Sequence, residues 1–326
     1  MEGFSYNVVY RALGIRKQAV AQWLVRKDIR NELLNQLELI VRDVREEHPG
    51  MGLRFIYETL DVPEIGRDRF EKHFKEIGYG VKREKSYTRT TDSRGVTKFE
   101  NLTQDIELKR MDQLWVSDIT YFAVGNKFYY LTFILDAFTR RIVGHSVASS
   151  LLTEQTTLPA LEMAFKARKY NKNNKPLDLI FHSDGGGQYY SKTFIKSLRF
   201  LDVKSSMAET VYENSKAERI NGVIKNNYLA YWNIKSFKDL EKYVDRAVQA
   251  YNFKKPHTRL KLQTPISFEQ SLLTLHCQKQ TEDEQLINGK IRKDGHLAHP
   301  FLSQKNLRLT IYRWKYKFEL NKNGQR

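Results

Sequence analysis

Cysteine is almost absent from this chain of 326 residues, which contains only Cys277. A disulfide framework and a zinc site made of paired cysteines are therefore excluded. Long apolar runs are missing too, since no stretch approaches the ~20 residues that a membrane-spanning helix needs. No signal-peptide pattern opens the sequence. We therefore expect a soluble, cytoplasmic protein without a membrane partner.

Acidic residues are scarce relative to basic ones. The chain has 38 Asp and Glu against 55 Lys and Arg, which gives a net charge of +17 at pH 7 and a pI near 9.6. Its hydrophobic content of 40% is ordinary for a globular protein, and its length suits about two domains with a real core. A basic excess of this size indicates a polyanionic partner such as nucleic acid.

Three acidic residues are predicted to lie on three different structural elements. Asp118 lies within LWVSDITYF, an apolar and aromatic run typical of a buried strand. Asp184 follows a strand predicted over Leu177 to Phe181, and the glycines after it let the backbone come close to a ligand. Glu218 lies on a helix that Asn214 or Ser215 is expected to cap. That helix has an apolar stripe of Ala217, Ile220, Ile224 and Tyr228.

Together these acids suit phosphodiester chemistry. In-line displacement at phosphorus places charge on the attacking and the leaving oxygen, and two Mg²⁺ ions held by carboxylates stabilise both. Lys225 lies two turns beyond Glu218 on the same flank of the helix, where its charge suits a phosphate. A single such acid is usually a turn, cap or solvated residue. Four other acids are interpreted in that way: Asp136, Asp202, Glu209 and Glu213.

The stretches around these acids predict an α/β core. Strands at Phe128 to Asp136 and Arg141 to Ser149, joined by the turn AFTR, extend the Asp118 strand into an antiparallel meander. A helix is predicted from Thr157 to Arg168, and an amphipathic helix from Phe237 to Phe253. The basic loop KKPHTRLKLQTP follows.

The N-terminal stretch from Tyr6 to Lys27 has a helix-turn-helix pattern with a turn at Gly14. Its second helix is expected to pack inward through Ala19, Val20, Trp23 and Leu24. The outward residues suit phosphates and base edges, and they are Arg16, Lys17, Gln18 and Gln22. An amphipathic helical hairpin with a solvated basic face is the alternative.

Beyond residue 30 the sequence predicts a helix from Asn31 to Glu47, a Pro and Gly break, and another helix that ends near Gly78. A basic, extended linker follows, in which Lys82, Arg83, Arg89 and Lys98 are expected to contact DNA. Near the C-terminus, aromatic and charged residues alternate from Tyr312 to Leu320. This pattern indicates either a small basic, β-rich DNA-binding appendage or a strand docked on the core.

Several motifs resemble the integrase core of bacterial insertion-sequence transposases of the OrfA and OrfB type. They are LWVSDITYF, ILDAFTRRIVGHSV, HSDGGGQYYS, AERINGVIKNNYL and AYNFKKPHTRLKLQTPISFE. That family shares a DDE, ribonuclease H-like core with retroviral integrases. The resemblance implies that Asp118, Asp184 and Glu218 are the catalytic, metal-binding triad and that Lys225 contacts DNA. Only the loop before Glu218 departs from the family pattern, in being slightly shorter.

The resemblance also implies a domain order and an activity. We expect a helix-turn-helix at residues 1–30, a second helical DNA-binding unit at 31–80, a linker at 81–107, the ribonuclease H-like core at 108–275 and the appendage at 276–326. A homo-oligomer on double-stranded DNA, at the bacterial nucleoid, is expected to bind transposon ends, cut them and join a 3′-hydroxyl to target DNA. Two Mg²⁺ ions are expected as cofactors, and Mn²⁺ is expected to be able to replace them. A ribonuclease H-like nuclease or resolvase, or a DNA-binding regulator with an inactive core, is the alternative.

Overall fold

A computed structural model describes residues 6–81, 99–104, 106–208 and 214–274. The chain divides into two compact units, Met1–Arg83 and Glu84–Arg326, and each has its own core. Lys82, Arg83, Arg89 and Lys98 of the predicted linker lie outside the described residues. The predicted appendage at 276–326 lies outside them as well. Within the described residues, no helix has the length and apolarity needed to cross a membrane.

The first unit is helical, as predicted. It contains α1 (Tyr6–Ala12), α2 (Lys17–Glu47), α3 (Leu53–Leu60) and α4 (Arg67–Glu76). Its core joins the C-terminal half of α2 to α3 and α4 through Leu34, Leu37, Val41, Met51, Leu53, Ile56, Ile65, Phe70 and Phe74. Arg45 fixes the predicted break after α2, because its guanidinium donates to the carbonyls of Pro49, Met51 and Tyr79.

The N-terminal part of this unit differs from the sequence prediction. The turn at Gly14 is present, with φ of 65°. However, α2 runs without interruption from Lys17 to Glu47, so the helix predicted to begin at Asn31 is only its second half. The physical reason is that no glycine or proline stands between Lys17 and Glu47 to end the helix.

The predicted packing of the helix-turn-helix is also wrong. Trp23 is 52% exposed and Leu24 is 46% exposed, and α1 buries no residue. Ala19 is exposed and Val20 is only partly buried. Two helices joined by a short turn cannot cover an apolar face by themselves, and α3 and α4 pack on the other end of α2 instead.

The second unit is organised on a five-stranded mixed sheet with the order β3-β2-β1-β4-β5. The strands are β1 (Leu114–Val124), β2 (Lys127–Asp136), β3 (Ile142–Ala148), β4 (Ile180–Ser183) and β5 (Lys204–Met207). The first three form the predicted antiparallel meander, and β4 and β5 continue the sheet parallel to β1. This is the arrangement of the ribonuclease H-like core that we expected. Leu177 is 71% exposed and the fourth strand begins at Ile180, later than predicted.

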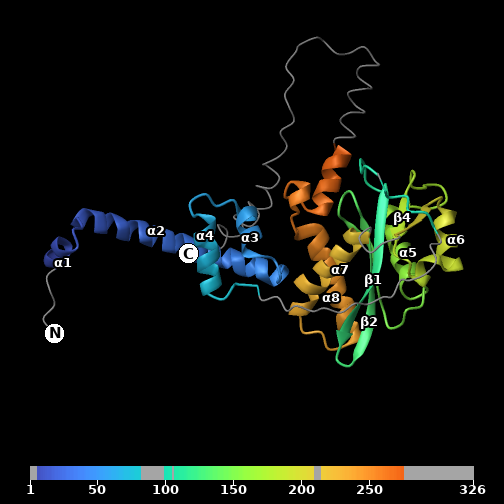
Figure 1. The fold of residues 1–326 in the computed structure, drawn as a ribbon, viewed down its shortest axis with the longest axis horizontal. Coiled ribbons are helices and arrows are strands. Elements are labelled where there is room, and N and C mark those ends of the chain that lie inside the picture. The colour runs from blue at the N-terminus through green and yellow to red at the C-terminus, as the bar shows by residue number, and fades with distance from the viewer. Residues whose placement is uncertain (1–5, 82–98, 105, 209–213, 275–326) are drawn as a thin grey trace, which may run out of the picture. The chain divides into compact units, whose positions relative to one another are not determined.

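Helices cover both faces of this sheet (Figure 1). On one face lie α7 (Ser215–Asn227) and α8 (Phe237–Gln249), and on the other lie α5 (Thr157–Arg168) and α6 (Lys192–Phe200). Gly144 allows α5 to pack closely on β3, because a Cβ at this position would lie 2.1 Å from the carbonyl oxygen of Ala160. The sheet therefore holds α7 and the loop after β4 in fixed positions beside β1.

Short irregular helices complete the unit. They are η1 (Gly187–Tyr190), η3 (Leu229–Tyr231), η4 (Ala250–Lys254) and η5 (Thr258–Leu260), of which η4 is a π-helix that continues α8. The predicted amphipathic helix to Phe253 is thus made of α8 and η4. The predicted basic loop follows it and contains η5.

A buried ionic network fixes one end of α5. Arg168 donates to Asp112 at 2.9 Å and to Glu269 at 2.6 and 2.8 Å, and it lies 3.4 Å from Asp136. Asp136 also accepts from the backbone amides of Phe138 and Thr139, each at 2.9 Å. The turn role predicted for Asp136 is therefore confirmed. The network additionally joins the start of β1, the end of β2 and residues 265–274.

Candidate active site

Two of the three acids lie at the same end of the paired stretch of β1 and β4. Strands β1 and β4 pair in parallel register, and their last paired residues are Ser117 and Ser183. Asp118 and Asp184 directly follow these two residues in the chain. Because β4 ends at Ser183 while β1 continues, Asp184 begins a loop beside Asp118, as the sequence predicted.

The loop that carries Asp184 is held by local contacts. The Asp184 Oδ1 atom accepts a hydrogen bond from the backbone amide of Gly186 at 3.1 Å. A Cβ at Gly186 would itself lie 3.1 Å from that oxygen, so the tight turn favours glycine. The buried hydroxyl of Tyr189 lies 2.9 Å from Ser117 Oγ, which ties the loop to β1 directly before Asp118.

Helix α7 brings Glu218 to the same region through three polar contacts with β1. Asn214 Nδ2 donates to the carbonyl of Ser117 at 2.9 Å. Asn221 Nδ2 donates to Asp118 Oδ2 at 2.8 Å, and Lys225 Nζ donates to Thr120 Oγ1 at 2.8 Å. The predicted apolar stripe is buried against the sheet: Ala217, Ile220, Ile224 and Tyr228.

One detail of α7 contradicts the sequence prediction. Asn214 stands at the N-cap position, but no side chain caps the helix there. The amide of Asn214 bonds to β1 instead, because tertiary packing places that carbonyl within its reach. Glu218 is exposed in the first turn of α7, where a negative charge is favourable to the helix dipole.

Electrostatic repulsion links the three carboxylates, which we call the acid group (Asp118, Asp184 and Glu218). Burial, followed by repulsion from Asp184 and Glu218, raises the pKa of Asp118 to about 7. Burial also raises the pKa of Asp184. Burial together with the nearby Asp184 and Asp118 raises the pKa of Tyr189 well above its usual value. Asp184 and Glu218 therefore both act on Asp118 near the end of the paired strands.

The acid group suits a divalent cation by the kind of donor it offers. Hard ions such as Mg²⁺ prefer carboxylate oxygens, and the repulsion on Asp118 is what a bound cation would relieve. In the described part of the chain, no three His, Cys, Asp or Glu side chains are already arranged to hold a metal ion. The three carboxylates therefore do not form a closed ligand shell in this structure.

Asn221 is the residue of this region that the sequence analysis missed. An asparagine on a helix is usually a surface residue, so its contact with Asp118 was not expected. Its signal was its spacing, since Glu218, Asn221 and Lys225 follow one another at intervals of three and four residues. Lys225 also lies 5.4 Å from the ring centre of Tyr121, and burial lowers its pKa.

The residues predicted to contact DNA in the first unit lie at the start of α2. Arg16 is the N-cap residue of α2, and Lys17 and Gln18 are in its first turn. Gln22 follows one turn later, and all four side chains are exposed. They form a donor-rich helix start that is open to solvent.

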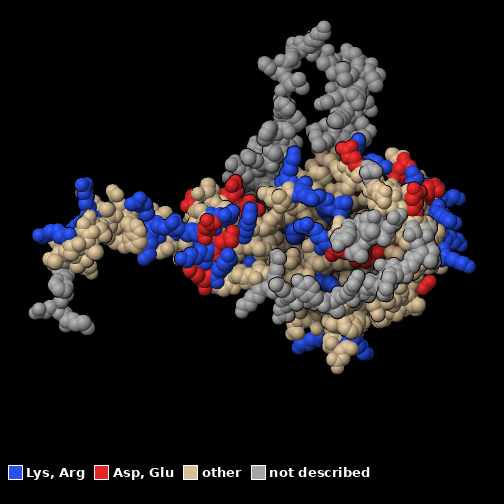
Figure 2. Space-filling view, viewed as in Figure 1, with Lys and Arg blue, Asp and Glu red and all other residues tan. Residues whose placement is uncertain are grey.

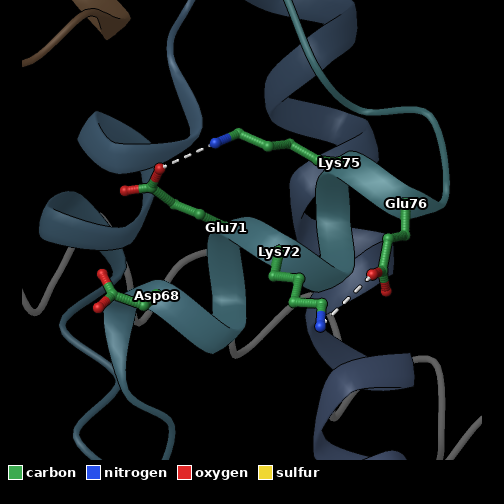
Figure 3. A pocket seen from close by; sticks show the side chains of 5 residues that line it. All are labelled: Asp68, Glu71, Lys72, Lys75 and Glu76. Carbon is green, nitrogen blue, oxygen red and sulfur yellow. Dashed lines mark hydrogen bonds and ion pairs between the residues drawn. The ribbon is translucent and has the colours of Figure 1, made fainter.

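A pocket on α4 shows what an ordinary charged surface looks like in this protein (Figure 3). It measures about 360 Å³ and is lined by Asp68, Glu71, Lys72, Lys75 and Glu76. Its charges are paired along the helix, with Lys75 at 3.4 Å from Glu71 and Lys72 at 4.0 Å from Glu76. Such exposed pairs contribute little energy and satisfy one another, so this pocket is a solvated helix face.

We expect Asp118→Asn to raise the thermal unfolding midpoint of the metal-free protein at pH 8. In the folded protein the pKa of Asp118 is about 7, above the usual 3.8. Protonation of Asp118 therefore stabilises the fold at low pH, and this contribution is lost as the pH rises through 7. The advantage of the variant should shrink toward pH 5, and Mg²⁺ should raise the midpoint of the wild type only. Circular dichroism melts with EDTA or Mg²⁺ measure this, with Asp202→Asn on an exposed turn as control. A variant less stable than the wild type at pH 8 would contradict it.

Comparisons with known proteins identify related families and sequences. The sequence matches two families described as integrase core domains, over residues 109–212 and 203–265. The transposase for insertion sequence element IS629 of Shigella sonnei is 33% identical over 191 residues, which cover 57% of this chain and 62% of the relative. This chain thus spans less than two thirds of that relative's length.

Two further comparisons cover more of the related chain. The HTLV-2 integrase catalytic core domain in complex with magnesium has a TM-score of 0.37 and 21% identity, covering 48% of this chain and 96% of that one. A putative transposase for insertion sequence element IS986/IS6110 of Mycobacterium tuberculosis is 30% identical over 213 residues, which cover 63% of this chain and 76% of the relative. On this identity and coverage, together with its integrase core, the chain belongs to the family of insertion-sequence transposases.

Proposed function

We propose that this protein binds the ends of an insertion sequence, cuts a DNA strand there and joins the freed 3′-hydroxyl to a second DNA segment. The observation that carries this proposal is the placement of the acid group. Asp118 and Asp184 follow the last residue pair of two parallel strands, and Glu218 of α7 acts electrostatically on Asp118. Family membership supplies the class of reaction.

In this proposal Asp118, Asp184 and Glu218 are the catalytic, metal-binding residues. Two bound Mg²⁺ ions would supply charge stabilisation to the attacking and leaving oxygens of the phosphate. The chain's own residues orient the participants. Asn221 fixes the carboxylate of Asp118 through its 2.8 Å hydrogen bond, and Lys225 offers a cation to DNA beside Thr120.

The parts around the core would recognise and hold DNA. We assign end recognition to the exposed start of α2, with Arg16, Lys17, Gln18 and Gln22, and weaker contacts to the basic residues 82–98 and 276–326. Joining one end to a second segment requires that two DNA segments are held together. A chain with one acid group therefore acts as a homo-oligomer assembled on DNA.

A strand-transfer assay tests the proposal. The full chain is incubated with Mg²⁺ and labelled duplex DNA that carries the element's end, or a shuffled end as control. We expect a cut strand with a 3′-hydroxyl and longer joined products from the true end only. Cutting without joining would instead support a nuclease or resolvase, and binding without cutting would support a regulator.

The start of α2 provides a separate prediction about sequence recognition. Gln18→Ala and Gln22→Ala should reduce the preference for end DNA over shuffled DNA by about 1–3 kcal/mol, because base-edge contacts carry specificity. Arg89→Ala and Lys98→Ala should weaken both DNAs alike. Fluorescence anisotropy over a range of salt concentrations measures both effects, with Gln36→Ala as an exposed control further along α2. Equal loss on both DNAs for Gln18→Ala would refute the assignment.

A further inference from the structure

Helix α7 has a second charged flank that the acid group does not use. Glu218 and Lys225 lie on one side of its buried stripe. At 3.6 residues per turn, Lys216 and Arg219 fall on the opposite side of that stripe. In Figure 2, Lys and Arg side chains gather on the face of the second unit next to a recess in which acidic atoms are visible.

The second flank faces cations from two other segments. Arg140, in the turn between β2 and β3, interacts electrostatically with Arg219 and Arg259, and Lys216 interacts with Arg140 and Arg259. Lys255, after η4, interacts with Arg219. We call Arg140, Lys216, Arg219, Lys255 and Arg259 the cationic cluster. Segments far apart in the sequence thus contribute five positive charges that repel one another.

Asp136 acts electrostatically on Arg140, but four of the five cations lack an ion pair within the described part of the chain. There, no hydrogen bond or ion pair joins the side chains of Arg140, Lys216, Arg219 or Arg259 to an acidic residue. Burial and repulsion from Arg259 and Arg219 lower the pKa of Arg140, and burial and repulsion from Arg219 lower that of Lys255 to about 8. Partly buried like charges are unfavourable unless an anion joins them. The cluster therefore has the character of an anion site.

A glycine lies between the two flanks of α7. Gly222 is near the middle of the helix, where glycine is less favourable than alanine. Packing does not require it, because a Cβ there would meet only Asn226 Nδ2, at 3.9 Å. On the helix surface Gly222 is on the solvent side, away from the buried stripe. A missing side chain at this place lets another backbone cross the helix closely.

We propose that the cationic cluster binds backbone phosphates of a DNA strand that crosses α7 at Gly222 and presents its reacting phosphate to the acid group. This inference rests on the proposed function. A helix is about 10 Å wide and a DNA strand advances about 3.4 Å per nucleotide, so the two contacts are about three nucleotides apart. The strand needs both flanks, because one places the phosphate that reacts and the other fixes the direction of the strand.

Neutral phosphates provide the test. The full chain, without divalent metal, is titrated with labelled end DNA in which one methylphosphonate at a time replaces a charged phosphate. We expect one or two adjacent substitutions to weaken binding by the wild type about tenfold, since each removes a charge-assisted contact. The variant Arg140→Gln/Arg259→Gln should bind unmodified DNA as weakly as the wild type binds the substituted DNA. A methylphosphonate at the sensitive positions should weaken its binding no further. For this variant, the slope of the logarithm of the binding constant against the logarithm of the salt concentration should be less steep by about 0.9 for each lost phosphate contact.

Two matched variants separate this site from general charge. Lys192→Gln/Lys196→Gln removes two exposed charges from α6 and should keep the wild-type pattern of sensitive positions. Gly222→Ala should keep or raise the unfolding midpoint and still weaken binding. The proposal is overturned if Arg140→Gln/Arg259→Gln stays sensitive at every position that affects the wild type, or if Gly222→Ala binds normally.

This binding pattern is read without any cutting. If the wild type shows this pattern of sensitive phosphates but does not join DNA strands, the proposed function is contradicted and the inference about the cationic cluster stands. If the wild type joins DNA strands normally but shows no such pattern, only the inference about the cationic cluster is contradicted.

Discussion

Asp118→Asn, Asp184→Asn and Glu218→Gln are each expected to abolish DNA cutting and joining while DNA binding persists. Each change keeps the shape of the side chain and removes one negative charge from the acid group. We expect the rate to fall at least about a thousandfold, which corresponds to about 4 kcal/mol of activation free energy. The strand-transfer assay measures the rate, and a mobility-shift titration measures binding.

Matched controls decide whether the effect belongs to this site. Glu162→Gln, on the exposed face of α5, and Asp202→Asn, on an exposed turn, remove the same charge elsewhere on the core and should retain activity. Mg²⁺-dependent cutting at the wild-type rate by any one of the three variants would remove that residue from the acid group.

The largest effect on stability is expected from Arg168→Met. Its guanidinium is 8% exposed and pairs with Asp112, Asp136 and Glu269, whose side chains are at most 10% exposed. Removing the cation leaves these buried carboxylates with too little positive charge, because Arg141 pairs only with Glu269. We expect the free energy of unfolding to fall by about 3–5 kcal/mol. Urea denaturation followed by circular dichroism measures it.

An exposed ion pair provides the comparison. Lys175 pairs with Asp202 at 2.5 Å, but these side chains are 38% and 69% exposed. Lys175→Met should therefore cost less than about 1 kcal/mol. A loss of similar size in the two variants would mean that the buried network does not hold the end of α5.

Local sequence patterns predicted those strands and helices of the core that are determined by neighbouring residues. The apolar run around Asp118, the meander after it and the helix from Thr157 to Arg168 are where the sequence placed them. The three acids were predicted to form a site because each stands in a distinctive motif. The parallel register that brings Asp118 and Asp184 together follows from the sheet, and the sequence indicated it only through the family resemblance.

The missed features depend on contacts between distant residues. Asp112, Asp136 and Glu269 are far apart in the sequence, so the network around Arg168 left no local pattern. Asn221 was missed for the same reason. The helix-turn-helix prediction assumed that apolar spacing implies burial, whereas Trp23 and Leu24 are exposed among the residues that the structure describes.

Iron-directed cleavage of the protein chain tests the central claim most directly, namely that Asp118, Asp184 and Glu218 form one divalent-metal site. Fe²⁺ replaces Mg²⁺ in the full chain, and ascorbate and peroxide then generate radicals that cut the backbone next to the bound ion. We predict cuts close to all three acids, suppressed by excess Mg²⁺ and lost in Asp118→Asn. Cuts confined to the acids of α4, at Asp68, Glu71 and Glu76, or cuts unchanged in Asp118→Asn, would contradict it.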